Sequence, residues 1–178
     1  MNLRIADRRL DSPVAAPLAQ ALLAEIEDRY GEPDADPDHL TGDDLAPPVG
    51  AFVVAWLDGH PVGCGGLRRY DDGVGELKRM YVDPGWRGRG VARAVLGQLE
   101  ARARRLGYRR LVLETGVRQP EAIALYTAAG YEPIEPYGFY RTSPLSRPES
   151  WGSELRVTAA RGSAALRAAA IMALVRSP

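Results

Sequence analysis

The feature that most constrains the fold of this chain is a strand, a glycine-rich loop, a long amphipathic helix and a second strand in direct succession. The first strand, Val74 to Val82, alternates between apolar and polar residues, and the loop after it contains three glycines. The helix, Arg89 to Leu106, keeps its apolar residues on one stripe, and Gly107 ends it. Leu111 to Leu113 then forms a buried strand. This order, from Leu77 to Thr115, requires a right-handed parallel crossover.

The segment before this unit predicts antiparallel strands. Ala51 to Leu57 and Pro61 to Arg68 are apolar stretches joined by an Asp-Gly turn, which is a strong hairpin signal. A second turn, Asp71 to Gly73, leads into Val74 to Val82, so the three stretches form a meander. We therefore expect an α/β (α+β) fold with a mixed, mostly antiparallel sheet and helices on both faces. Further elements are predicted at Leu3 to Asp7 (strand), Pro17 to Tyr30 (helix), Pro120 to Ala129 (helix), from Tyr131 (short strand) and at Ser153 to Val157 (final strand).

Length and composition fit one soluble globular domain, because the chain has 178 residues, of which 46% are apolar. The longest uncharged apolar run, Ala168 to Val175, is too short to cross a bilayer, so no membrane span is expected. The N-terminus mixes charges where a secretory signal needs an apolar core, and the single cysteine, Cys64, forms no internal disulfide. These features predict a cytoplasmic protein.

Charge is distributed unevenly along the chain, although the formal net charge is zero. Residues 1–50 hold 11 acidic and 4 basic residues, net −7, and the remainder is net +7. Much of the negative charge lies in a long Asp- and Pro-rich loop, Glu32 to Gly50. Such a loop is either a solvated connector or a binding loop, and in the second case it would favour a cationic ligand.

The last twenty residues, Ala159 to Pro178, are Ala-rich and helix-prone. They predict a terminal helix that docks or frays, with a homodimer contact as the alternative. We therefore divide the chain into a domain of residues 1–158 and a C-terminal helix or tail of residues 159–178.

The glycine-rich loop predicts an anion site, because the first turn of a helix has unpaired N–H groups and a partial positive charge. Gly88 and Gly90 lack the Cβ atoms that would keep an anion away. Two common nucleotide motifs fit poorly. There is no Gly-Lys-Ser/Thr of a Walker A loop, and Arg93 stands where a dinucleotide fingerprint needs a third small residue.

Two separated motifs resemble those of the GNAT superfamily of N-acetyltransferases. Arg87 to Ala92, Arg-Gly-Arg-Gly-Val-Ala, is similar to the R/Q-x-x-G-x-G/A acyl-CoA signature, and Ala122 to Tyr131 is similar to the second block, A-x-x-L-Y-x-x-x-G-F/Y. The resemblance covers about Ala51 to Pro136. It implies a sheet that is split around acyl-CoA, which lies between the strands ending near Val82 and Thr115.

The resemblance also implies roles for individual residues. Tyr126 matches the usual proton donor of the family, with a packed aromatic as the alternative reading. Glu76 matches a carboxylate that draws the amine proton through water; Glu114 is the second choice, and a plain surface carboxylate is the alternative reading. The residues implied to hold the cofactor, largely through the backbone, are Met80, Tyr81, Val82, Arg87, Gly88, Arg89, Gly90, Val91 and Ala92, with the Gln119 side chain at the cofactor arm or its bound water.

The expected function is transfer of an acetyl group from acetyl-CoA to a primary amine of a small molecule or peptide, by direct attack in a ternary complex. A non-catalytic acyl-CoA-binding or sensor protein is the alternative. No metal is expected, since His39, His60 and Cys64 form no ligand pattern. No nucleic-acid partner is expected, because the Arg residues around Arg102 to Arg110 match a solvated helix face. The residues leave the acceptor amine and the acyl chain length open.

Overall fold

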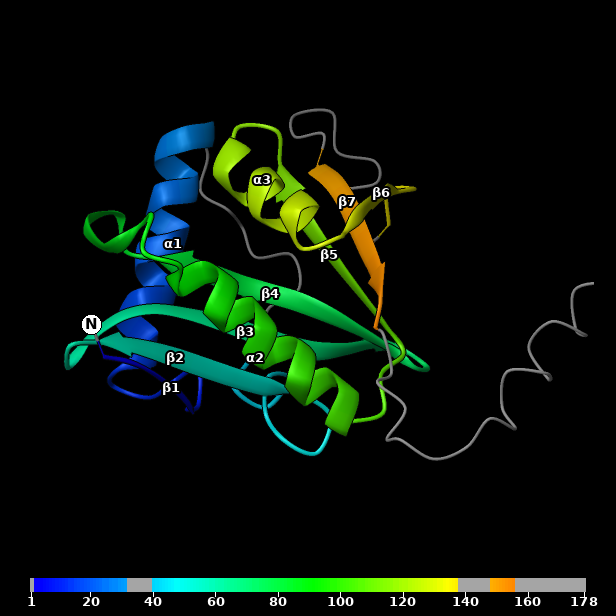
Figure 1. Ribbon diagram of the computed structural model, residues 1–178, viewed down its shortest axis with the longest axis horizontal. Helices are drawn as coiled ribbons and strands as arrows, with labels where there is room; N and C mark the ends of the chain where they lie inside the picture. The colour runs from blue at the N-terminus through cyan, green and yellow to red at the C-terminus, as the bar shows by residue number, and fades with distance from the viewer. Residues whose placement is uncertain (1, 32–39, 138–147, 156–178) are drawn as a thin grey trace, which may run out of the picture.

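The computed structural model describes residues 2–31, 40–137 and 148–155 (Figure 1). It contains one mixed sheet and three α-helices. The strands are β1 (Leu3–Asp7), β2 (Ala51–Leu57), β3 (His60–Asp71), β4 (Val74–Val82), β5 (Arg110–Gly116), β6 (Glu132–Ile134) and β7 (Pro148–Glu154). The helices are α1 (Ala15–Tyr30), α2 (Val91–Arg105) and α3 (Pro120–Ala128), with a short 3-10 turn, η1 (Pro84–Trp86).

The seven strands follow the order β1-β2-β3-β4-β5-β7-β6. Five of the six neighbouring strand pairs are antiparallel. The pair β4 and β5 is parallel, because α2 returns the chain to the end of the sheet at which β4 begins. The expected mixed, mostly antiparallel sheet is confirmed.

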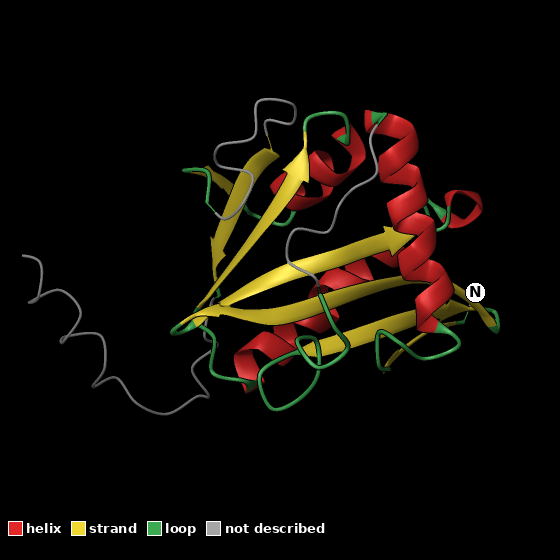
Figure 2. Ribbon diagram, turned by 180° about the vertical axis from the view of Figure 1, so that it is seen from behind, coloured by secondary structure: helices red, strands yellow, loops and turns green. Residues whose placement is uncertain are grey.

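Helices cover both faces of this sheet, as expected. α1 lies on one face, and α2 and α3 lie on the other (Figures 1 and 2). Successive side chains of β2 point to opposite faces of the sheet, so this strand contributes to both hydrophobic cores. Val53 and Ala55 belong to the core under α2, whereas Phe52 and Val54 belong to the core under α1. All seven residues of β2 are consequently buried.

The final strand differs from the sequence prediction. It spans Pro148–Glu154 instead of Ser153 to Val157, and it lies between β5 and β6. The sequence did not predict this strand, because it contains Pro and Gly and has no apolar alternation. Pairing with β5, which is distant in sequence, stabilises it. The predicted strand end beyond Leu155 and the predicted C-terminal helix, Ala159 to Pro178, lie outside the described residues.

No helix within residues 2–31, 40–137 and 148–155 is long and apolar enough to cross a membrane.

Candidate active site

The sheet splits between β4 and β5, and we refer to the space between the two diverging strand backbones as the cleft. The two strands pair only from Val74 to Glu76 on β4 and from Arg110 to Val112 on β5. Beyond this point they diverge, and Figure 2 shows them as a V that opens toward α1 and α3. The facing edges of Leu77–Val82 and Leu113–Gly116 therefore make no ladder with each other, and their backbone groups border the cleft.

A β-bulge redirects β4 beside this cleft. Cys64 of β3 lies opposite Tyr81 and Gly66 lies opposite Lys78, so Gly65 alone faces two residues of β4. One of the two, Arg79, has φ +56°, in the left-handed region. After the bulge, Val82 lies in the core under α2, and Tyr81 lies in the core under α1.

The loop between β4 and α2, residues 83–90, contains the glycines that predicted an anion site, and we call this loop with the first turn of α2 the cradle. Gly88 (φ +74°) and Gly90 (φ +79°), the N-cap of α2, both have left-handed backbones, which glycine adopts without strain. A Cβ at either position would meet no atom within 4 Å, so the space in front of the loop is open. Within the part of the chain that the structure describes, the N–H groups of residues 88–92 have no backbone acceptor. The loop can therefore bind an anionic group.

Two arginines of this loop differ in their surroundings. The Arg87 side chain turns inward, donating from Nε to the Val82 carbonyl at 2.9 Å and from Nη2 to Glu25 at 2.5 Å. Arg89 is exposed, with its guanidinium 5.0 Å from the centre of the Trp86 ring. Arg89 can add positive charge at the mouth of the cradle, whereas Arg87 contributes only its backbone.

Gln119 lies on the opposite lip of the cleft, where β5 leads into α3. It is the N-cap of α3, its N–H donates to the Gly116 carbonyl at 2.9 Å, and Thr115 Oγ1 donates to its Oε1 at 3.4 Å. The Gln119 amide N–H₂ group has no acceptor among the described residues.

Tyr126 is the one buried residue of α3. Its ring lies 5.7 Å from the ring of Tyr131, whose hydroxyl donates to Glu100. Burial raises the pKa of the Tyr126 phenol well above its usual value, so the hydroxyl stays protonated at neutral pH. This side chain belongs to the core under α2, on the face of the sheet opposite to that of Glu76.

Glu76 is the last residue of β4 that pairs with β5, so it lies at the apex of the cleft. It is 1% exposed, which contradicts the alternative reading as a plain surface carboxylate. Arg68 Nε lies 2.6 Å from its Oε2, and Lys78 Nζ lies 3.2 Å from its Oε1. The Tyr137 hydroxyl donates to Oε1 at 3.1 Å. A buried carboxylate is thus held by two cations and a phenol.

Sequence reasoning missed Tyr137. The residue follows Pro136 at the end of the second motif, and no pattern of the chain marks it. Its ring packs edge-on against Tyr70 at 4.8 Å. Burial, followed by the charges of Glu76 and Glu114, raises its pKa above the usual range, so it acts as a hydrogen-bond donor.

Glu114 lies on the same face of the sheet, on the β5 side of the cleft. In the pairing of β5 with β7, Glu114 lies opposite Ser150, a residue that is 2% exposed. The Ser150 hydroxyl has no hydrogen-bond partner within the described ranges, so it is a polar atom that a ligand or water can satisfy.

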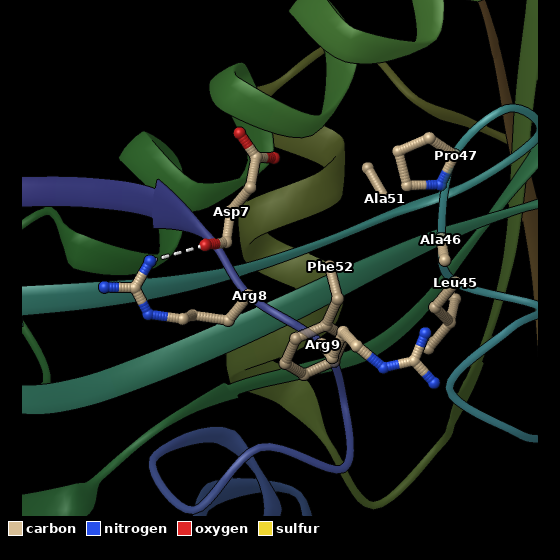
Figure 3. A pocket seen from close by; sticks show the side chains of 8 residues that line it. All are labelled: Asp7, Arg8, Arg9, Leu45, Ala46, Pro47, Ala51 and Phe52. Carbon is tan, nitrogen blue, oxygen red and sulfur yellow. Dashed lines mark hydrogen bonds between the residues drawn. The ribbon is translucent and has the colours of Figure 1, made fainter.

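Two other features lie away from this chemistry. Cys64 is buried, and burial raises the pKa of its thiol to about 12, so it is an unreactive core residue. A surface hollow of about 330 Å³ opens near the ends of β1 and the start of β2 (Figure 3). Its cations are already engaged: Arg8 donates to the Asp7 carbonyl, and Arg9 binds Asp11 and Asp43.

Comparison with known proteins identifies this architecture. The sequence profile of the acetyltransferase (GNAT) family matches residues 18–131. The chain is 42% identical over 137 residues to a protein of Azospirillum brasilense named IAA acetyltransferase, covering 74% of this chain and 90% of that protein.

Solved structures of acyltransferases have the same fold as this chain. A protein of Klebsiella pneumoniae described as an acyl-CoA N-acyltransferase superposes with a TM-score of 0.72 at 32% identity, covering 86% of this chain and 97% of that one. A GNAT family acetyltransferase of Elizabethkingia anophelis, solved with acetyl-CoA bound, has the same fold, with a TM-score of 0.62 at 18% identity and coverage of 86% and 99%.

Proposed function

Because this chain belongs to the acetyltransferase (GNAT) family, we propose that it transfers an acetyl group from acetyl-CoA to a primary amine, which attacks the thioester directly in a ternary complex. The observation that carries the proposal is the cleft, which combines two unpaired strand edges with an open, glycine-lined anion cradle at one end.

The residues present fit acyl-CoA. The N–H groups of residues 88–92 suit the pyrophosphate, and Arg89 adds a nearby positive charge. The backbone of Met80, Tyr81 and Val82 borders the cleft where an extended pantetheine arm could hydrogen-bond, with the Gln119 amide on the other lip. When bound, acetyl-CoA supplies the activated acetyl thioester.

The chain's own residues would then position the reactants and move protons. Tyr126 keeps its phenol proton at neutral pH, and we propose that it donates this proton to the departing thiolate. On the other face, Glu76 is proposed to accept the amine proton through a water molecule, since a carboxylate has about four acceptor sites and the donors named among the described residues are Arg68, Lys78 and Tyr137. Glu114 is the second candidate for this base.

The acceptor is proposed to be a small-molecule or peptide amine, and the acidic segment of the first fifty residues favours a cationic one. A cytoplasmic location is part of the proposal and rests on the single cysteine, Cys64, because disulfide-bonded cysteines are typical of oxidising compartments.

The test compares CoA binding and turnover in matched glycine variants. Gly90→Glu should abolish the rise in melting temperature that CoA produces, because the new carboxylate would meet the pyrophosphate. Gly107→Glu is the control: Gly107 also has a left-handed backbone (φ +85°) with open space around it, but it follows the far end of α2. An equal CoA-induced shift in the wild type and Gly90→Glu would refute the assigned site.

Turnover then separates catalysis from binding alone. Release of the CoA thiol from acetyl-CoA in the presence of a panel of amines supports the enzyme. Binding of CoA without thiol release across amino acids, polyamines, aminoglycosides, arylamines and peptide N-termini would instead support a non-catalytic acyl-CoA-binding protein.

A further inference from the structure

The last two turns of α1 contact both lips of the cleft. Glu25 and Arg29 are one helical turn apart and form an ion pair of 2.6 Å. Their side chains are only 23% and 24% exposed, although both are charged. α1 ends at the next residue, Tyr30, with Gly31 in a left-handed conformation.

The β4 lip is held through Arg87. Glu25 Oε2 accepts from Arg87 Nη2 at 2.5 Å, while Arg87 Nε donates to the carbonyl of Val82, the last residue of β4. Because Arg87 itself belongs to the glycine-rich loop, its guanidinium ties α1 both to the end of β4 and to this loop.

The β5 lip is held through Arg118 and Glu121. Arg29 forms an ion pair with Glu121, in the first turn of α3. Arg29 Nη1 donates to the Arg118 carbonyl at 2.9 Å, and Arg118 Nη1 donates back to the Arg29 carbonyl at 2.8 Å. The Arg118 N–H also donates to the Tyr30 hydroxyl at 3.1 Å. These reciprocal bonds fix the loop that follows β5.

The two sets of contacts meet at Arg29, which binds Glu25 on one side and Glu121 on the other. No strand ladder joins β4 to β5 at this end of the sheet, so other contacts must set the distance between the lips. α1 supplies such contacts from outside the plane of the sheet.

We propose that Glu25, Arg29, Tyr30, Arg87, Arg118 and Glu121 form a clasp that sets the width of the cleft, with Glu25 and Arg29 as positioning residues for acyl-CoA binding. The proposal rests on the proposed function in one respect, that acyl-CoA occupies this cleft.

The protonation states of the clasp agree with its geometry. Burial alone would raise the pKa of Glu25 and of Glu121. The hydrogen bonds and charges of the arginines outweigh that effect and hold both pKa values below their usual range. Both carboxylates are therefore charged and paired at neutral pH.

The first experiment measures CoA affinity by titration calorimetry for Glu25→Gln, Glu121→Gln and the double variant. Because partly exposed ion pairs are individually modest, each single change should weaken CoA binding by about 3- to 10-fold. If both ends act through one clasp, the double variant should bind CoA more tightly than the product of the single effects predicts. Glu27→Gln, an exposed residue of the same helix, should leave the affinity unchanged.

The second experiment measures the width of the cleft without any ligand. Spin labels on Arg93→Cys, in the first turn of α2, and Val117→Cys, after β5, lie on opposite lips and at exposed positions, while Cys64 is buried. The distance distribution should broaden or lengthen in the Glu25→Gln/Glu121→Gln double variant and stay unchanged in Glu27→Gln.

The outcomes separate the two proposals. If the wild type binds no CoA, the proposed function fails, and the label distances still test the clasp. If CoA binds to the wild type, but neither affinity nor distance changes in the double variant, the clasp is refuted and the ion pairs have no role in setting the cleft.

Discussion

Glu76 is surrounded by more donors than a solvent-exposed base would have. Arg68, Lys78 and Tyr137 all bind its carboxylate, and the side chain is almost fully buried. Such an arrangement keeps the carboxylate in one orientation and leaves little freedom for it to approach an acceptor directly. At the residue scale, a relay through one water therefore fits better than direct contact.

The first prediction separates the two candidate bases. Glu76→Gln should lower kcat by about 10²- to 10⁴-fold, the range expected for loss of a general base, while Glu114→Gln should change kcat by less than about 3-fold. Initial rates with saturating acetyl-CoA measure both. Because Gln removes the buried negative charge beside Arg68 and Lys78, urea unfolding must show that each variant is folded under the assay conditions. The reverse order of effects would make Glu114 the base.

The second prediction concerns the phenol on the opposite face. Tyr126→Phe should lower kcat by about 10- to 1,000-fold, and the dissociation constant of acetyl-CoA should stay within about 3-fold, because only the proton donor is removed. Tyr131→Phe is the matched control, since it removes a neighbouring buried hydroxyl that is bound to Glu100. Wild-type turnover in Tyr126→Phe would make this side chain a packing residue.

Local residue patterns predicted the glycine cradle but not the surroundings of Glu76. Gly88 and Gly90 are marked by the sequence because a left-handed turn before a helix requires glycine regardless of distant contacts. The donors of Glu76 come from β3, from β4 itself and from the segment after β6, so they depend on strand register and chain path.

At the scale of elements, the contact between β1 and α2 holds an edge strand in place. Arg102 of α2 is nearly buried and donates from Nε to Asp7 Oδ1 at 2.6 Å and from Nη2 to Oδ2 at 3.0 Å. Its Nη1 binds the carbonyl and side chain of Gln98. This bidentate pair connects the last residue of β1 to the last turns of α2 across the sheet.

The third prediction is that Asp7→Asn destabilises the fold by about 1 kcal/mol, a value reduced for the solvent exposure of Asp7. The hydrogen bonds from Arg102 hold the pKa of Asp7 below its usual value. The stabilisation is therefore complete above about pH 4, the unfolded value, and is lost as the pH falls through the lower folded pKa. Urea unfolding at a series of pH values should show the wild type and Asp7→Asn converging only in acid.

Elements with a clear period were predictable within a few residues, and the element without one was not. β1, β2 and β4 match their predicted bounds, because alternating or continuous apolar residues between turn signals define them. β7 was misplaced by about five residues, because a strand that is inserted between β5 and β6 is selected by its neighbours and has no pattern of its own.

At the scale of the whole molecule, charge separates along the chain into a net −7 segment and a net +7 remainder. Two aspartates of the acidic segment already have partners within the described residues. Asp43 forms an ion pair with Arg9, and Asp44 accepts a hydrogen bond from the Thr41 N–H. Asp34, Asp36 and Asp38 lie outside the described residues, so their charge is known from the sequence alone. These three aspartates are the part of the segment whose effect on an acceptor is still to be tested.

The last prediction is that Asp34, Asp36 and Asp38, changed together to Asn, raise KM for a cationic amine and leave KM for acetyl-CoA nearly unchanged. The effect should be modest and should fade with added salt, because exposed charges beyond about 8 Å are screened at physiological ionic strength. A control variant with Asp71→Asn, Asp72→Asn and Glu154→Gln removes the same charge from exposed positions outside the acidic segment, at the end of the sheet where β4 and β5 pair. If both triple variants shift the acceptor KM equally at low salt, the effect comes from net charge and the acidic segment is a solvated connector.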